Sequence, residues 1–273
     1  MSAHPVPGEG SQAASLSGTP LSAANAPYLS IVVPAYNEEK RLGASLKRML
    51  AYFDSQAYPF EILVVDDGSV DGTSTLVDQI AACRPQVRLL SYASNRGKGH
   101  AVRYGMLRAQ GARVLFSDAD LATPIEEVEK LLAQLDAGYD IAIGSRDVKG
   151  SQLIKRESVL REFGGRAFNK LVQLLTVPGI HDTQCGFKLF TQSAAQKVFS
   201  RCKVDDFAFD VEALYLAVRL LGLRVAETPI RWAHQEGSKI SPLRDGLRMI
   251  RTVFRIRLTR YEAVASAAEL HPR

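Results

Sequence analysis

The chain of 273 residues has few cysteines and no long apolar run, and both absences exclude classes of protein. Cys83, Cys185 and Cys202 are odd in number and form no C-x-x-C pair, so neither a disulfide framework nor a zinc site is indicated. No apolar run approaches the roughly 18–20 residues that a membrane span needs. We therefore expect a protein of a reducing compartment, cytoplasmic and without a transmembrane segment.

Residues 1–27 also lack what a targeting segment requires. They are rich in Ala, Ser, Gly and Pro, with neither a basic start nor an apolar core, so a disordered low-complexity tail is predicted. The apolar content of 46% is ordinary for a protein with a full core. The net charge of +5 is concentrated late in the chain. We expect one domain over residues 28–240, followed by a basic amphipathic helix and tail over residues 241–273.

Residues 30–145 repeat one plan, in which an apolar run ends in polar residues and a helical pattern follows. The expected strands are Ser30–Val33, Glu61–Val65, Val87–Tyr92, Arg113–Ser117 and Tyr139–Ile143. The expected helices span residues 38–53, 73–83, 99–110 and 125–136. This alternation favours an α/β fold with a doubly wound, mostly parallel sheet, whose ligands bind outside the carboxyl ends of the strands.

Two carboxylates end the apolar run Val114–Ser117. Alternate residues of a strand point to the same side, so Asp118 and Asp120 would project together from the strand end. Two like charges so close need a compensating cation or ligand, and carboxylate oxygens suit Mg²⁺ or Mn²⁺ shared with phosphates. An isolated pair of this kind is also typical of a solvated corner after a strand.

Polar residues follow the other predicted strands as well. A carboxylate at a strand end can accept N–H groups of a nucleotide base, and a lysine between glycines offers a cation to a phosphate. Each segment taken alone is equally typical of a turn. Five such strand ends together predict one site, formed by the segments Pro34–Glu38, Asp66–Ser69, Asn95–Gly99, Asp118–Asp120 and Gly144–Arg146.

The order of these segments resembles family 2 glycosyltransferases with the GT-A fold. The resemblance is carried by Val33–Glu38, Val65–Ser69, Asn95–Gly99 and Asp118–Asp120. Later segments are similar to the dolichyl-phosphate β-glucosyltransferases, and these are Gly144–Arg146, His181–Phe190, Phe207–Glu212 and Glu236–Lys239. The similarity covers about residues 29–260. Dolichyl-phosphate mannosyltransferases share the first half but match Asp182–Phe190 less well.

This resemblance implies UDP-glucose as donor, a lipid phosphate as acceptor and inversion at the anomeric carbon. It places Asp118 and Asp120 on the metal and the donor diphosphate. The residues that it places around the nucleotide are Pro34, Tyr36, Glu38, Asp66 and Lys98, and Asp67 is a further candidate. Eukaryotic members begin with a membrane anchor, whereas this chain begins with the polar tail described above.

A lipid phosphate is already anionic, so its attack requires cationic positioning rather than a strong base. Guanidinium groups suit phosphate oxygens, and we expect Arg146 and Arg161 on the acceptor phosphate, with Gln184 beside them. Asp210 opens a helical stretch that runs to about Leu221. It is expected to be catalytic or to orient the acceptor or the sugar, although an acid in the first turn of a helix is also favoured by the helix dipole alone.

A basic amphipathic helix is expected between Leu243 and Leu258. Its apolar stripe is offset by about 100° from a stripe of arginines, which is typical of helices that lie in a membrane interface. A helix between Val159 and Leu175 is a second candidate for lipid contact. The alternative is a helix packed on its own domain with its arginines in water. We expect peripheral contact with the cytoplasmic face of a membrane.

Three other functions compete with this prediction. A GDP-mannose-dependent dolichyl- or polyprenyl-phosphate mannosyltransferase would share the fold. An enzyme with a soluble or polysaccharide acceptor would need Asp210 as a general base. A non-catalytic, membrane-associated nucleotide-binding protein is a third, but the intact set Asp118, Asp120, Lys98 and Arg146 argues against it. Nucleic-acid binding is not expected, because the basic C-terminal residues share a helix with a broad apolar face.

Overall fold

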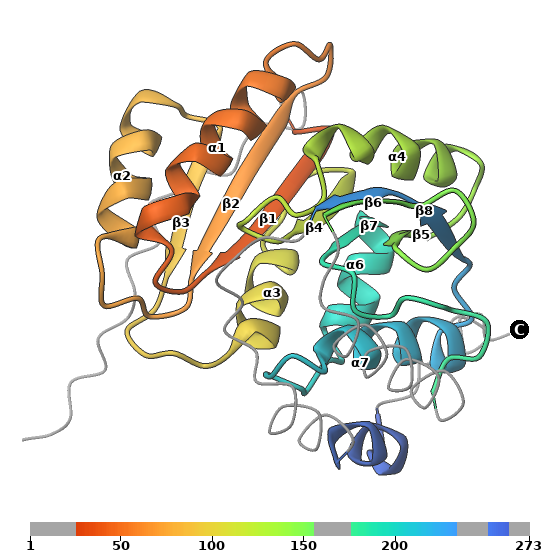
Figure 1. The fold of residues 1–273 in the computed structure, drawn as a ribbon. Coiled ribbons are helices and arrows are strands. Elements are labelled where there is room, and N and C mark those ends of the chain that lie inside the picture. The colour runs from red at the N-terminus through yellow and green to blue at the C-terminus, as the bar shows by residue number, and fades with distance from the viewer. Residues whose placement is uncertain (1–25, 156–175, 234–250, 262–273) are drawn as a thin grey trace, which may run out of the picture.

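The computed structural model describes residues 26–155, 176–233 and 251–261. Within them, a seven-stranded sheet has the order β3-β2-β1-β4-β7-β5-β8 (Figure 1). Its strands are β1 (Leu29–Ala35), β2 (Phe60–Asp66), β3 (Val87–Ser91), β4 (Arg113–Ser117), β5 (Ile141–Ser145), β7 (Phe187–Thr191) and β8 (Val225–Pro229). Only β7 runs antiparallel to its neighbours, so the predicted α/β fold with a mostly parallel sheet is confirmed.

Helices connect the strands and cover both faces of the sheet (Figure 1). They are α1 (Glu39–Phe53), α2 (Thr73–Cys83), α3 (Lys98–Met106), the 3₁₀ turn η2 (Ile125–Glu127), α4 (Val128–Asp136), α6 (Gln192–Phe199), α7 (Phe209–Tyr215) and the π-helical turn η3 (Leu216–Leu220). A short sheet pairs β6 (Gln152–Lys155) with β9 (Arg231–Ala233). Residues 251–258 form a further helix.

The core has two layers because successive residues of a strand face opposite sides of the sheet. In β1, Val32 joins the cluster under α3, α6 and α7, whereas Ile31 and Val33 join the cluster under α1, α2 and α4. Strands buried on both faces read as continuous apolar runs, which is why β1, β2 and β4 are apolar without alternation. Apolar packing on both faces holds the sheet rigid, and the loops at the carboxyl ends of its strands are therefore supported by a fixed framework.

Sequence and structure agree least at the boundaries and after residue 145. The strand expected at Tyr139–Ile143 is shifted, since β5 covers Ile141–Ser145, and α3 ends at Met106 rather than near residue 110. No strand was expected at β7, which enters the sheet between β4 and β5. The chain leaves β3 at one edge and returns to β4 on the other side of β1, so the order of strands switches between β1 and β4. Ligands of open α/β sheets bind at such a switch.

Candidate active site

Asp118 and Asp120 lie in the turn that follows β4, immediately beyond its last residue, Ser117. The strand expected at Arg113–Ser117 is confirmed, and both acids follow it, so the alternation of side chains along a strand does not by itself place them together. The turn nevertheless brings the two carboxylates together. Burial raises the pKa of Asp120, and the charge of Asp118 raises it further. The Asp120 carboxylate also accepts a hydrogen bond of 3.0 Å from the backbone N–H of Ala122.

Lys98 begins α3 and brings a cation to this pair of acids. Its Nζ lies 2.6 Å from Asp118 Oδ1. Burial opposes the charge of the ammonium, but the carboxylates of Asp118 and Asp210 outweigh that effect and raise the pKa of Lys98. The lysine is therefore charged at neutral pH and lies against an acid that follows β4, while its predicted contact with a phosphate stays a prediction.

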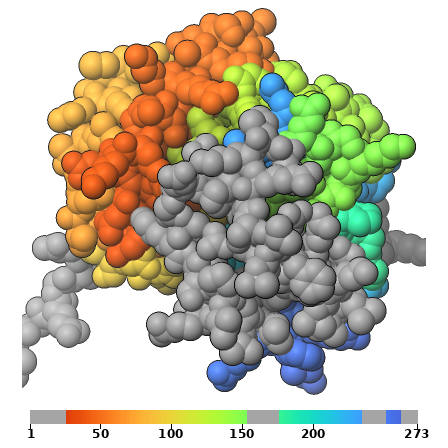
Figure 2. Space-filling view, in the orientation of Figure 1, coloured from red at the N-terminus to blue at the C-terminus, as the bar shows by residue number. Residues whose placement is uncertain are grey.

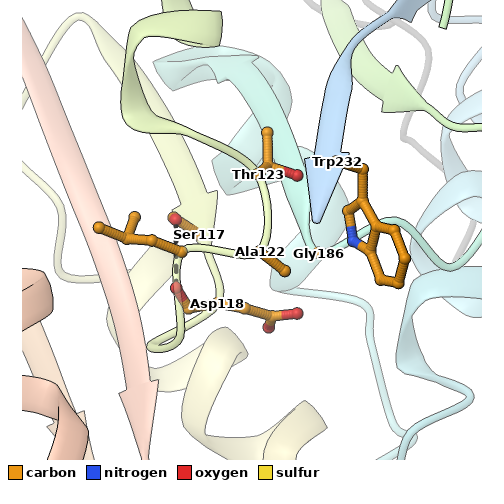
Figure 3. Close-up of a pocket in the computed structure, with 7 residues that line it drawn as sticks. Ser117, Asp118, Ala122, Thr123, Gly186 and Trp232 are labelled. Carbon is orange, nitrogen blue, oxygen red and sulfur yellow. Dashed lines mark hydrogen bonds between the residues drawn. The ribbon is translucent and has the colours of Figure 1, made fainter. Parts of the chain in front are cut away.

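Gly186 lies against Asp118 from the neighbouring loop. The Asp118 backbone N–H donates a hydrogen bond of 3.0 Å to the Gly186 carbonyl oxygen, and a Cβ added to Gly186 would lie 1.9 Å from Asp118 Oδ2. Only glycine leaves room for the carboxylate here. Figure 3 shows both residues at a small pocket whose far side is formed by the Trp232 indole, and its lining residues are Ser117, Asp118, Leu121, Ala122, Thr123, Gly186 and Trp232.

Lys188 and Asp210 form a buried ion pair that interacts electrostatically with Lys98 and Asp118. Lys188 of β7 is 1% exposed, and its Nζ lies 2.5 Å from Oδ1 of Asp210 in α7. The pKa of Asp210 is raised, because the effect of burial exceeds the opposing effect of the Lys188 and Lys98 charges. Sequence reasoning selected Asp210 but overlooked Lys188, because a lysine in an apolar run reads as a surface residue until its strand is known to be central.

Asp66 and Asp67 are nearly buried and hold the loops around them. Asp66 accepts hydrogen bonds from the Ser69 backbone N–H at 3.0 Å and from the hydroxyl groups of Ser69 and Ser74. Asp67 accepts hydrogen bonds from Tyr92 Oη at 2.7 Å and from two backbone N–H groups of the loop before α3, at 2.7 and 2.9 Å. These loop hydrogen bonds are compatible with a contact to a nucleotide base, which stays a prediction.

The segment after β1 adds a basic side chain that sequence reasoning missed. Pro34 is buried in β1, Tyr36 is 37% exposed, and Glu38 accepts a hydrogen bond of 2.7 Å from Arg41 Nη2. This bond with Glu38 raises the pKa of Arg41, and the charges of Asp120 and Asp118 raise it as well. Arg41 thus lies near the candidate metal ligands, three residues into the helix that follows Glu38.

Arg146 is held by a carboxylate in a bidentate pair. Its Nε and Nη2 donate to the two oxygens of Asp182, at 2.7 and 2.9 Å, and its backbone N–H donates to the same group at 3.0 Å. The guanidinium lies 5.3 Å from the centre of the Trp232 ring. Gln184 is half-buried in the same loop as Asp182. Arg161 lies outside the described residues, so its predicted role at the acceptor is a proposal, as are those of Arg146 and Gln184.

Asp118 and Asp120 suit a divalent metal whose coordination shell is completed by phosphate oxygens. In the described ranges, no group of three or more His, Cys, Asp or Glu side chains could enclose an ion. A site of two carboxylates at an open pocket is what Mg²⁺ or Mn²⁺ uses when the substrate supplies phosphate ligands. Asp118, one third exposed in its side chain, and the adjacent Asp120 fit that requirement.

A model of the glycosyl transferase family 2 matches residues 30–199, which include β1, β4 and the turn with Asp118 and Asp120. The chain belongs to glycosyl transferase family 2. It is similar to the dolichyl-phosphate beta-glucosyltransferases of Drosophila melanogaster, at 42% identity over 241 residues, and of Homo sapiens, at 40% over 245. Both matches cover 84% of this chain, and they cover 74% and 75% of those relatives.

Among solved structures, one neighbour of this glycosyltransferase is glucosyl-3-phosphoglycerate synthase from Mycobacterium tuberculosis, in complex with Mn²⁺, UDP and glucosyl-3-phosphoglycerate. The TM-score is 0.59 at 19% identity, over 88% of this chain and 82% of that one. An identity this low supports the fold alone. The expected GT-A fold is confirmed, and the resemblance found in the sequence motifs is confirmed at the level of the family.

Proposed function

We propose that this glycosyltransferase transfers glucose from UDP-glucose to a dolichyl or polyprenyl phosphate, with inversion at the anomeric carbon. The observation that carries the proposal is the ion pair of Lys98 with Asp118 at the switch between β1 and β4, in a chain about 40% identical to dolichyl-phosphate beta-glucosyltransferases. A diphosphate with a bound metal needs protein groups of both charges. Asp118 and Asp120 would bind the metal ion, and the Lys98 ammonium would bind the phosphate oxygens.

The nucleotide would lie along the carboxyl ends of β1 and β2. Tyr36, partly exposed after β1, presents a ring to the base, and Asp66 or Asp67 accepts N–H groups of uracil. These two carboxylates are rigid because neighbouring hydroxyl and N–H groups already bind them. A rigid acceptor selects a base by geometry, because only a base whose N–H groups lie at matching positions can donate to it.

Asp118 and Asp120 would hold Mg²⁺ or Mn²⁺. Such a metal stabilises the charge that develops on the departing diphosphate. Lys98, which pairs with Asp118, would place its ammonium on a phosphate oxygen. Arg41 adds a second positive charge near the acids. These cations bind the leaving group and orient it opposite the incoming nucleophile.

A phosphate acceptor agrees with the state of Asp210. A general base for a hydroxyl acceptor must be able to take a proton from the substrate, but Asp210 is buried and its Oδ1 lies 2.5 Å from the Lys188 ammonium. An anionic phosphate needs no such base. Arg146, Arg161 and Gln184 would position it, and Asp182 would hold the Arg146 guanidinium in one orientation.

A lipid acceptor has to be reached at a bilayer. In the part of the chain that the structure describes, no helix has the length and apolarity needed to cross a membrane. Because the proposed acceptor is a lipid, we propose action at the surface of a membrane, on its cytoplasmic face. The apolar chain of such an acceptor lies in the bilayer, so its phosphate is accessible at the membrane surface.

The decisive experiment supplies both donors to the purified protein. The protein is incubated with radiolabelled UDP-glucose or GDP-mannose, Mg²⁺ or Mn²⁺ and a polyprenyl phosphate, and label is counted in the organic phase. Label from UDP-glucose, suppressed by EDTA and by Asp120→Ala, supports the proposal. If label enters the organic phase from GDP-mannose alone, the donor is GDP-mannose and not UDP-glucose. If transfer is unchanged in EDTA, the metal assignment is overturned.

A further inference from the structure

The helix of residues 251–258 has one face buried in the domain and one face exposed. Val253 and Ile256 are 2% and 0% exposed and belong to the core under α3, α6 and α7. Phe254 and Leu258 are 50% and 81% exposed. These two residues are four positions apart and therefore lie together on the outward side of the helix. The apolar residues predicted for this helix thus divide between the core and the surface.

The outward side is also strongly basic. Arg251, Arg255 and Arg257 are exposed, and residues 251–261 contain four arginines and no acid. In the space-filling view, these residues form the blue surface at the lower margin of the molecule (Figure 2). Exposed Phe and Leu side chains beside arginines combine apolar area with attraction to anionic lipid headgroups, which is the combination that binds a bilayer surface.

Short contacts connect this helix to the candidate active site. The Thr252 hydroxyl donates a hydrogen bond of 3.4 Å to Asp206 Oδ2, in the loop before α7. The next residue, Phe207, is 38% exposed, and the Lys98 ammonium lies 5.9 Å from its ring centre. The backbone N–H of Gly99 donates a hydrogen bond of 2.8 Å to the Asp205 carbonyl oxygen of the same loop. One loop therefore contacts both Lys98 and the exposed helix.

A buried carboxylate fastens the helix in this position. Glu212 of α7 is 0% exposed and accepts a hydrogen bond of 2.8 Å from Tyr261 Oη, just after the helix. It also accepts hydrogen bonds from the backbone N–H groups of Lys203 and Val204, at 3.0 and 2.8 Å. The outward side is thus presented by a fixed element that is anchored on the protein core.

We infer that Phe254, Leu258, Arg251 and Arg255 form a docking face for an anionic bilayer surface, and we call these four residues the docking face. Phe254 and Leu258 enter the boundary between headgroups and acyl chains, and the two arginines bind lipid phosphates. The loop with Phe207 then holds the Lys98 side of the site at the headgroup level. This use of the face rests on the proposed function, but the binding of a bilayer does not require catalysis.

Flotation with vesicles tests the face directly. Full-length protein is mixed with vesicles of phosphatidylcholine, alone or with phosphatidylglycerol. The wild type is expected to float with the anionic vesicles. Phe254→Ser/Leu258→Ser is expected to bind them at least about tenfold more weakly, because the variant lacks the two apolar side chains that would enter the bilayer. Arg251→Gln/Arg255→Gln is expected to lose the preference for anionic vesicles.

Tyr139→Ser is the matched control. Tyr139 is 37% exposed but precedes β5, at the opposite edge of the sheet from the active site, so its loss should not change flotation. A thermal melt of each variant separates weak binding from failure to fold. The inference is overturned if folded Phe254→Ser/Leu258→Ser floats as the wild type does. It is also overturned if the wild type does not float, or if these substitutions only dissociate a dimer in sedimentation.

Two acceptors separate this inference from the proposed function. A short-chain, water-soluble polyprenyl phosphate should be glucosylated equally by the wild type and by Phe254→Ser/Leu258→Ser. A long-chain acceptor embedded in anionic vesicles should be glucosylated at least about tenfold more slowly by the variant, in line with its weaker binding. If the wild type floats but transfers glucose to neither acceptor, the docking face stands and the proposed function fails.

Discussion

The Lys98 ammonium lies 2.6 Å from Asp118 Oδ1, so a lysine occupies one oxygen of a proposed metal ligand. A divalent metal and Lys98 therefore compete for Asp118, and the incoming diphosphate offers the displaced lysine new oxygens. A metal that arrives alone has to break an ion pair without that compensation. This relationship predicts that metal and nucleotide bind better together than separately.

Lys98→Met should therefore change the two affinities in opposite directions. Without nucleotide, Mn²⁺ should bind more tightly, because Asp118 has lost its competing cation. With metal present, UDP should bind about 10- to 100-fold more weakly, since a hydrogen bond to a charged group contributes roughly 1.5–3 kcal/mol. Electron paramagnetic resonance of free Mn²⁺ and calorimetry with UDP measure the two effects. Lys40→Met, at an exposed position of α1, is the control, and a loss of both affinities would contradict the competition.

Gly186→Ala should remove metal binding while the protein still folds. The added methyl group would lie 1.9 Å from Asp118 Oδ2, so the carboxylate has to rotate away from its position after β4. Mn²⁺-dependent binding of UDP should fall by at least about tenfold, the equivalent of 1.4 kcal/mol. The control is Gly43→Ala, where the new Cβ meets only Leu76 at 3.6 Å. Normal UDP affinity in Gly186→Ala would show that the position of Asp118 is not required.

The sequence predicted the edge of the sheet at which the site lies, because apolar runs that end in polar residues locate the strand ends before any contact is known. It therefore selected Asp118, Asp120 and Lys98. It also predicted that β4 ends at Ser117, but it did not predict that Gly186 faces Asp118, because that contact depends on how β7 pairs with β4. Pairing between residues about 70 positions apart has no local signal in the chain.

The partners of charged residues were the harder part of the prediction. Arg146 was selected for an acceptor phosphate, and its pairing with Asp182 emerges only when β5 and the loop before β7 are placed together. Lys188 was overlooked for the same reason. Residue type and spacing show which groups carry charge, but long-range contacts decide which charge is already compensated.

The pair of Lys188 with Asp210 should behave as a unit in stability measurements. Lys188→Met or Asp210→Asn alone leaves a buried charge without its partner, which typically costs about 3–5 kcal/mol. The double variant Lys188→Met/Asp210→Asn should be clearly more stable than the sum of the two losses predicts, because no charge is left buried. Urea unfolding of the four proteins gives the coupling energy. Additive losses would mean that the two groups do not interact.

Asp210→Asn also distinguishes the two classes of acceptor. If the acceptor is a phosphate, no proton has to be removed from it, and the folded variant should keep measurable glucosyl transfer. If the acceptor is a hydroxyl group and Asp210 is its base, turnover should fall by a factor of about 10²–10⁴. Single-turnover transfer to a polyprenyl phosphate measures this difference. The folded fraction of the variant is determined in parallel, so that lost stability is not mistaken for lost chemistry.

The pair of Arg146 with Asp182 should make the protein sensitive to acid. Burial alone would raise the pKa of Asp182, but the charge and hydrogen bonds of Arg146 outweigh it and lower the pKa. A lowered carboxyl pKa stabilises the fold above the pKa of the unfolded chain, about 3.9, and this stabilisation is lost as the pH falls through the folded value. The contribution of Asp182 should therefore be complete at pH 7 and decline below about pH 4.

Asp182→Asn tests that dependence. At pH 7 it should lower the free energy of unfolding by about 3–5 kcal/mol, because the Arg146 guanidinium loses its partner. The gap to the wild type should narrow as the pH falls below about 4, since the wild-type carboxylate is then protonated as well. Asp136→Asn, which breaks a surface pair with Arg113, should change stability by less than about 1 kcal/mol. A gap for Asp182→Asn that is constant from pH 7 to the acid limit would show that the carboxylate does not stabilise the fold through its charge.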